Sequence, residues 1–239
     1  MSEHTAKAFD GDLQDLARMV AEMGGRVEKQ VADSIDALAK RDSVLAQRIT
    51  QADSNIDALQ REIEEKAVLT IARRQPMAVD LRDIVGALRI ANDLERIGDL
   101  AKNIAKRVIA LNSEFPPSKL IRGVEHMTDL VLGQLKAVLD AYARRDLNKA
   151  MAVWRGDEEI DAMCTSVFRE LLTYMLEDPR NITFCIHLMF CAKNVERMGD
   201  HATNIAETVH YVIDGRPIAE SRPKGDTTTL ATLKAASDR

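Results

Sequence analysis

The chain has 239 residues, of which 46% are hydrophobic, 30% charged and 4% aromatic, and its formal net charge is −5. This composition excludes a disordered chain, and the length allows one large domain or two compact ones with a real core. The negative charge, with acidic and basic residues interspersed, argues against nucleic acid as the main ligand and against electrostatic binding to an anionic membrane.

The same composition favours helices over sheets. Aromatic residues are scarce, and there are only 11 Gly and 6 Pro, whereas sheets favour aromatic and β-branched residues and need frequent turns. No window reaches the ~18 apolar residues of a membrane span, and the first residues carry no apolar signal core. We therefore expect a cytoplasmic protein that does not insert into a membrane. The three cysteines include no CxxC pair, which predicts reduced thiols buried in the core.

Apolar periodicity predicts six long helices, interrupted by one proline-rich break. The break is NSEFPPSK at 112–119, where two consecutive prolines force an extended path. After residue 215 the periodicity ends, which predicts a mobile tail over 216–239. The predicted helices span 12–40, 42–74, 77–111, 120–144, 146–176 and 181–213.

The sequence contains an internal repeat. Residues 91–105 read ANDLERIGDLAKNIA and residues 192–206 read AKNVERMGDHATNIA, with nine of fifteen positions identical. Residues 37–57 also align with residues 141–161. These repeats predict an all-α fold of two homologous three-helix bundles with long antiparallel helices, over residues 1–114 and 115–215. A single six-helix bundle is the alternative, but it leaves the break between the repeats unexplained.

Each half carries two rows of acidic side chains at helical spacing. Residues four apart lie one turn apart on the same face of a helix, so like charges at this spacing repel. If neighbouring helices bring the rows together, their oxygens suit a hard or borderline cation such as Mg, Mn, Fe or Zn. The rows are Glu95 with Asp99 and Asp53 with Asp57 in the first half, and Glu196 with Asp200 and Asp157 with Asp161 in the second.

The position of these rows around the helix weighs against an enzyme. Glu95 and Asp99 lie off the apolar seam, on the solvent-facing flank, and no Glu-x-x-His occurs in either half. Di-iron enzymes of the ferritin type instead project their ligands into the bundle interior. An alternative is that the acidic rows are ordinary solvated surface, with Glu95 paired to Arg96 or Lys102. Recurrence of the rows in both halves favours the metal site.

Two further features belong to the same segments. Gly98 and Gly199 lie in mid-helix, where Gly costs about 1 kcal/mol relative to Ala, and this predicts close backbone approach. Simple helix–helix contact explains them equally well. His201 lies beside the second acidic row and is either a surface residue or a further metal ligand.

These motifs resemble the PhoU family. LERIGDLAKNI at 94–104 and VERMGDHATNI at 195–205 match its repeated motif, and QPMAVDLRDI at 75–84 is similar to its loop before the third helix. The resemblance covers about residues 10–213. It implies two symmetric three-helix bundles whose repeated acidic motifs bind metal ions, here Glu95, Asp99, Glu196 and Asp200 with the aspartates opposite. The second half departs from the pattern, since Asp80 and Arg82 have no counterpart there.

The resemblance also implies a regulatory role. Such proteins restrain phosphate uptake and repress the phosphate-starvation response by contacting the ATPase subunit of the phosphate ABC transporter and a membrane sensor histidine kinase. A homodimer is expected from the family. A helical scaffolding protein without metal and a carboxylate-bridged metal enzyme are the competing hypotheses.

Overall fold

The computed structural model describes residues 2–111, 118–220 and 222, and within them the chain is all-α, without a strand. The all-α prediction is therefore confirmed. The helices of the first half are α1 (Ser2–Lys40), α2 (Ser43–Ala52), α3 (Ser54–Arg74) and α4 (Val79–Leu111). Those of the second half are α5 (Ser118–Arg144), α6 (Leu147–Arg155), α7 (Asp157–Glu177), the short 3-10 helix η1 (Pro179–Asn181) and α8 (Ile182–Asp214).

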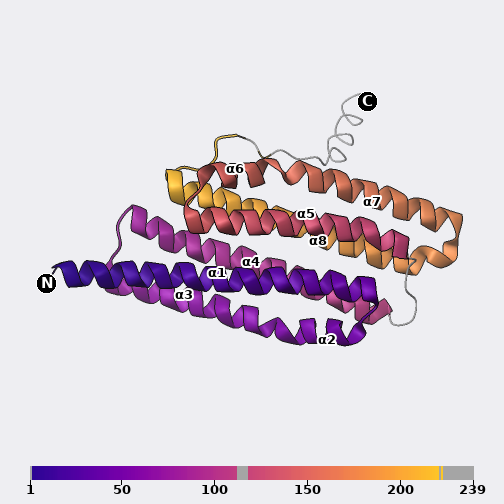
Figure 1. Ribbon diagram of the computed structural model, residues 1–239, viewed down its shortest axis with the longest axis horizontal. Coiled ribbons are helices and arrows are strands. Elements are labelled where there is room, and N and C mark those ends of the chain that lie inside the picture. Colours follow the sequence, from indigo (N-terminus) through magenta and orange to yellow (C-terminus); the bar gives the residue numbers. More distant parts are fainter. Residues whose placement is uncertain (1, 112–117, 221, 223–239) are drawn as a thin grey trace, which may run out of the picture.

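Each half is a bundle of three long rods, as predicted. The middle rod of the first half consists of α2 followed by α3, and that of the second consists of α6 followed by α7 (Figure 1). The two halves lie side by side, with α4 packed along α8 and α1 along α5. One cluster of buried apolar residues consequently runs through both halves.

The middle rods differ from the predicted single helices 42–74 and 146–176, because each is broken at one position. The breaks fall at Asp53, whose dihedrals stay helical (φ −55°, ψ −36°), and at Gly156 (φ −79°, ψ −1°). Such a break changes the direction of the apolar stripe very little, so periodicity does not reveal it. Its consequence is that Asp53 and Asp157 lie at the starts of α3 and α7, where the helix dipole favours a negative charge.

The turn between the first and middle rods has the same structure in both halves. Arg41 (φ 60°) and Arg145 (φ 52°) adopt left-handed backbone conformations. The next residue caps the following helix, because Asp42 accepts a hydrogen bond from the Leu45 amide (2.8 Å) and Asp146 accepts one from the Lys149 amide (3.0 Å). The repeat seen in the sequence is therefore a repeat of local structure.

The apolar seam of the third rod is buried, and the two glycines lie where it meets the middle rod. A Cβ at Gly98 would lie 3.1 Å from Cδ1 of Ile56, and one at Gly199 would lie 2.9 Å from Cδ1 of Ile160. The predicted close approach is confirmed, and it is helix–helix contact. All three cysteines lie in the described ranges, are buried and form no disulfide, as expected.

Two of the predictions fall largely on residues that the structure does not describe. These are the break at 112–119, of which 112–117 lie outside the described residues, and the tail, of which 221 and 223–239 lie outside. In the described ranges, no helix is both long and apolar enough to span a bilayer.

Candidate metal centre

The first acidic cluster is built around Asp53, at the junction of α2 and α3. Its side chain is almost fully buried, and Nε2 of Gln30 on α1 donates a hydrogen bond to it (3.0 Å). The same Nε2 lies 3.1 Å from the carbonyl oxygen of Gly98 and donates to it as well. Gln30 thus ties the first, middle and third rods together at the level of the cluster.

Lys102 on α4 joins Asp53 to Asp99. Its ammonium donates to Oδ2 of Asp53 and to Oδ1 of Asp99, each at 2.5 Å. Burial lowers the pKa of Lys102, but the hydrogen bonds and charges of the two aspartates outweigh it and hold that pKa above its ordinary value. The predicted convergence of the middle and third rods is therefore found, with a lysine between the carboxylates.

Glu95 and Asp57 complete the first cluster. Glu95 is half-buried on the flank of α4, and its pKa is raised by burial first and then by the negative charges of Asp99 and Asp57, with Arg96 opposing. Its distance to Arg96 is 3.6 Å (Nε to Oε2), which is a loose ion pair. Asp99 and Asp57 are therefore close enough to Glu95 for their charges to act on it, and the pairing of Glu95 with Arg96 is also present.

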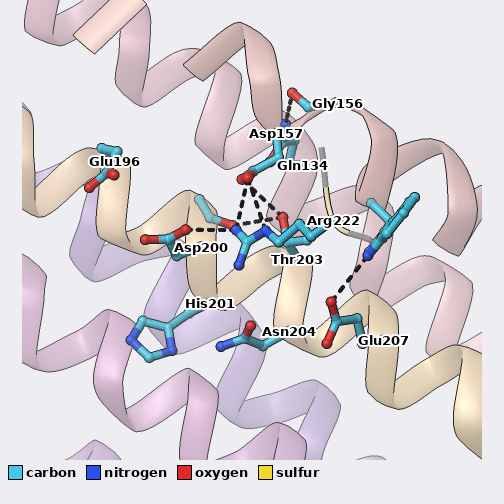
Figure 2. Close-up of polar contacts among 12 residues, drawn as sticks. Gln134, Gly156, Asp157, Glu196, Asp200, His201, Thr203, Asn204, Glu207 and Arg222 are labelled. Atoms are coloured by element: carbon cyan, nitrogen blue, oxygen red, sulfur yellow. Dashed lines mark hydrogen bonds and ion pairs between the residues drawn. The ribbon is translucent and has the colours of Figure 1, made fainter. Parts of the chain in front are cut away.

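The second acidic cluster has the same frame and a different cation. Asp157 is almost fully buried at the start of α7 and accepts a hydrogen bond from Oγ1 of Thr203 on α8 (3.1 Å). The guanidinium of Arg222 lies between the two carboxylates (Figure 2), with Nε 3.0 Å from Oδ2 of Asp157 and Nη2 2.7 Å from Oδ1 of Asp200.

Glu196 lies one turn before Asp200 on α8, without contact to Arg222. Its Oε1 accepts a hydrogen bond from Lys193 (2.8 Å), while its Oε2 is buried with no hydrogen-bond partner. Burial is the largest influence on Glu196 and raises its pKa; Asp200 and Asp161 raise it further, against Lys193. Buried carboxylate oxygens are rarely left without a hydrogen-bond partner, so Oε2 of Glu196 is the atom of this cluster that most needs an explanation.

Some of the important residues were not singled out from the sequence. Gln30 and Arg222 are polar residues of α1 and of the segment after α8, and nothing in their spacing marks them, while Lys102 was considered only as a partner of Glu95 and instead pairs with Asp53 and Asp99. Asp93 on α4 was also missed: its Oδ1 lies 2.8 Å from Nδ1 of His201 on α8. His201, treated above as a surface residue or a metal ligand, is thus a polar link between the two halves.

The donor set in each half fits a hard cation in its chemistry, since it consists of carboxylate oxygens from two neighbouring rods. Within the described part of the chain, however, no group of three or more His, Cys, Asp or Glu side chains is arranged so that it could hold a metal ion. In the arrangement seen here, a basic side chain lies between the carboxylates of both clusters. A metal ion would have to replace that side chain as the counter-ion.

Comparisons with known proteins agree with this architecture. The model of the PhoU domain matches the chain twice, over residues 20–108 and 124–209. The phosphate-specific transport system accessory protein PhoU homolog of Rhizobium meliloti is 57% identical over 231 residues, which cover 96% of this chain and 98% of that protein.

Solved structures of two relatives have the same fold. The crystal structure of PhoU from Pseudomonas aeruginosa superimposes with a TM-score of 0.81 at 41% identity, covering 87% of this chain and all of that chain. The phosphate transport system regulatory protein PhoU from Streptococcus pneumoniae gives a TM-score of 0.82 at 26% identity, covering 89% of this chain and all of that one. The repeated domain, the relatives and the fold together show that this chain belongs to the PhoU family.

Proposed function

We propose that this chain is an accessory regulator of a phosphate-specific transport system. It restrains phosphate uptake and represses the phosphate-starvation response when phosphate is plentiful. The observation that carries the proposal is membership of the PhoU family over both halves, with relatives named as accessory proteins of that transport system. A regulatory rather than a catalytic role suits a chain in which Glu95 and Asp99 are partly exposed on α4 instead of projecting into the bundle interior.

Two partners are proposed: the ATPase subunit of the phosphate ABC transporter and a membrane sensor histidine kinase. Both contacts place the protein at the cytoplasmic side of the membrane. Two copies of the chain are proposed to form a homodimer. Large apolar side chains exposed near the turns between the middle and third rods, such as Met77 and Leu176, support a role in binding other proteins.

Deletion of the protein tests the regulatory proposal. Without it, phosphate-scavenging genes should be expressed in phosphate-rich medium, and the wild-type chain supplied in trans should silence them again. The readout is transcript level or secreted phosphatase activity at high and low phosphate. Unchanged expression in the deletion strain at high phosphate would contradict the proposal.

We further propose that the two clusters bind metal ions such as Mg, Mn, Fe or Zn as part of this regulation. Support comes from the meeting of acidic rows in both halves and from the unpartnered Oε2 of Glu196. The residues that would hold the ion are Asp53, Asp57, Glu95 and Asp99 in the first half and Asp157, Asp161, Glu196 and Asp200 in the second. A bound ion would neutralise each cluster and so change the charge of the surface presented to partners.

Metal analysis with matched variants tests this second proposal. A variant with Glu95→Ala, Asp99→Ala, Glu196→Ala and Asp200→Ala should lose the metal that the wild-type protein carries when purified without chelator. A control with four exposed acids replaced should keep it (Glu64→Ala, Glu65→Ala, Glu158→Ala, Glu159→Ala). Added Mg, Mn or Zn should also raise the melting temperature of the wild type, because a ligand that binds the native state stabilises it. Equal metal content in the two variants would remove the assignment of the metal to these residues, and the absence of a thermal shift would favour a scaffold without metal.

A further inference from the structure

The two acidic clusters are neutralised by cations of different origin. In the repeated motif, Lys102 of the first half aligns with Thr203 of the second. Thr203 donates a hydrogen bond to Asp157 but carries no charge, so α8 itself brings no cation between Asp157 and Asp200. Arg222 supplies that cation from the segment that follows α8 (Figure 2). The cation between the carboxylates is therefore a side chain of the third rod in the first half, and a side chain of the segment after α8 in the second.

The described residues of this segment, 216–220 and 222, contact both the end of α8 and the second cluster. Gly215 ends the helix in a left-handed conformation (φ 82°), and its amide donates to the carbonyl of Tyr211 (2.9 Å). Nδ1 of His210 then contacts the carbonyl oxygen of Arg216 (3.0 Å). Ile218 packs against the core, and Arg222 reaches the carboxylates of Asp157 and Asp200.

The segment also forms one wall of a cavity of about 510 Å³ between α4 and α8. Pro217, Ile218 and Glu220 line it on the segment's side, while Arg89, Asp93 and Asn204 are among the residues that line it on the helices. The segment therefore helps to form this cavity and also supplies the cation of the second cluster.

The contacts of Arg222 are mainly electrostatic. Its side chain is 17% exposed and lies next to Asp157, which is 4% exposed, and Asp200, which is 38% exposed. With Arg222 removed, the Thr203 hydroxyl would be the one remaining hydrogen-bond donor to the buried carboxylate of Asp157 among the residues that the structure describes, and a buried charge so poorly compensated is costly. Another cation entering between Asp157 and Asp200 would remove that cost and compete directly with the guanidinium.

We propose that Arg222 is a detachable counter-ion, so that a divalent cation binding at the second cluster displaces it and releases residues 216–220 and 222 from α8. This inference rests on the proposed metal binding. Lys102 belongs to α4 and cannot leave with a mobile segment, so only the second cluster couples cation binding to a change in chain conformation. By linkage, binding of the segment to α8 weakens cation binding by the same factor as cation binding weakens the binding of the segment.

Hydrogen exchange measured by mass spectrometry, on the full chain with and without Mn²⁺, tests two points. It shows whether Arg222 holds the segment against α8 and whether Mn²⁺ releases it. In chelator, Arg222→Ala should speed exchange of the amides of residues 216–220 and 222 relative to the wild type. The control Arg216→Ala removes an equal charge from the same segment, at an exposed side chain, and should leave exchange unchanged. Adding Mn²⁺ to the wild type should raise exchange of the segment to the level of Arg222→Ala.

Calorimetric titration with Mn²⁺ gives the second readout. If the segment is seated about nine-tenths of the time, its removal should tighten one site about tenfold in Arg222→Ala and leave the other site unchanged. Binding of Mn²⁺ with equal affinity to wild type and Arg222→Ala, without release of the segment, would overturn this inference and leave the metal proposal intact. The absence of Mn²⁺ binding in both proteins would overturn both proposals.

Discussion

Lys102 is the partner of two carboxylates, one of which is buried. Removing a single member of such an arrangement leaves an uncompensated charge, whereas replacing both members costs much less. The second half shows that the fold tolerates an uncharged residue at the equivalent position, where Thr203 stands, provided that another cation is present.

We therefore expect Lys102→Met to lower the free energy of unfolding by about 3 kcal/mol, the usual cost of a broken buried pair. The double variant Asp53→Asn with Lys102→Met should recover a large part of that loss. Urea denaturation of both variants in chelator measures the coupling between the two residues. Strictly additive effects would show that the pair contributes nothing beyond its separate members.

Glu95 makes the free energy of unfolding depend on pH. Its pKa in the folded protein lies above the ordinary value of 4.5, because of burial and the neighbouring carboxylates Asp99 and Asp57. In the interval between the two values the folded state binds more protons than the unfolded state, so the free energy of unfolding falls as pH rises through it.

Accordingly, Glu95→Gln should be more stable than the wild type at pH 7 in chelator, and the advantage should vanish below pH 4.5. Melting temperatures across this range provide the measurement. Glu65→Gln, an exposed residue on α3, is the control and should show no such trend. An advantage for Glu95→Gln that does not depend on pH would point to packing rather than charge.

At the scale of the helix, the internal repeat is clearest in the turns between the first and middle rods, where Asp42 and Asp146 cap the helices that follow. The aspartate that follows the left-handed arginine accepts an amide hydrogen bond in both halves, so α2 and α6 begin in the same manner. An N-cap of this kind contributes typically about 1 kcal/mol.

Asp42→Ala and Asp146→Ala should each lower the free energy of unfolding by about 1 kcal/mol, and the two losses should add because the turns are separate. Chemical denaturation checks this expectation. Asp36→Ala, which removes only an exposed ion pair with Lys40, should cost less than either. Similar losses in all three variants would mean that the cap hydrogen bonds carry no special weight.

The helices, the repeat and the meeting of the acidic rows were all predictable from spacing, because burial of an apolar stripe fixes which residues face inwards. The break at Asp53 was not, since its dihedrals remain helical and the stripe continues across it. From the sequence, the pairing of Lys102 with Asp53 and Asp99 was only one of several ion pairs that this lysine could form. Arg222 could not be predicted at all, because its segment has no periodicity and its position depends on contacts with α8 that local sequence does not encode.

At the scale of the whole molecule, the contact between α4 and α8 includes a polar pair that the repeat does not share. Asp93 and His201 meet across it at 2.8 Å, while the aligned residues in the other half are Asn194 and Leu100. The pair is mostly buried, so either member alone would be poorly satisfied.

His201→Leu should therefore lower the free energy of unfolding by about 1–3 kcal/mol, because Asp93 loses its close partner. Adding Asp93→Asn gives this side of the interface the residues of the aligned positions and should restore most of the loss. The comparison is made by thermal and urea denaturation of the two variants. No recovery in the double variant would show that His201 acts through its shape alone.

The buried cluster that extends through both halves has a thermodynamic consequence. Neither half can lose its third rod without exposing apolar surface of the other. Local unfolding of one half therefore carries an additional free-energy cost from the other half. A gene assembled from two copies thus encodes one cooperative unit, which should give a single calorimetric peak whose van't Hoff and calorimetric enthalpies agree.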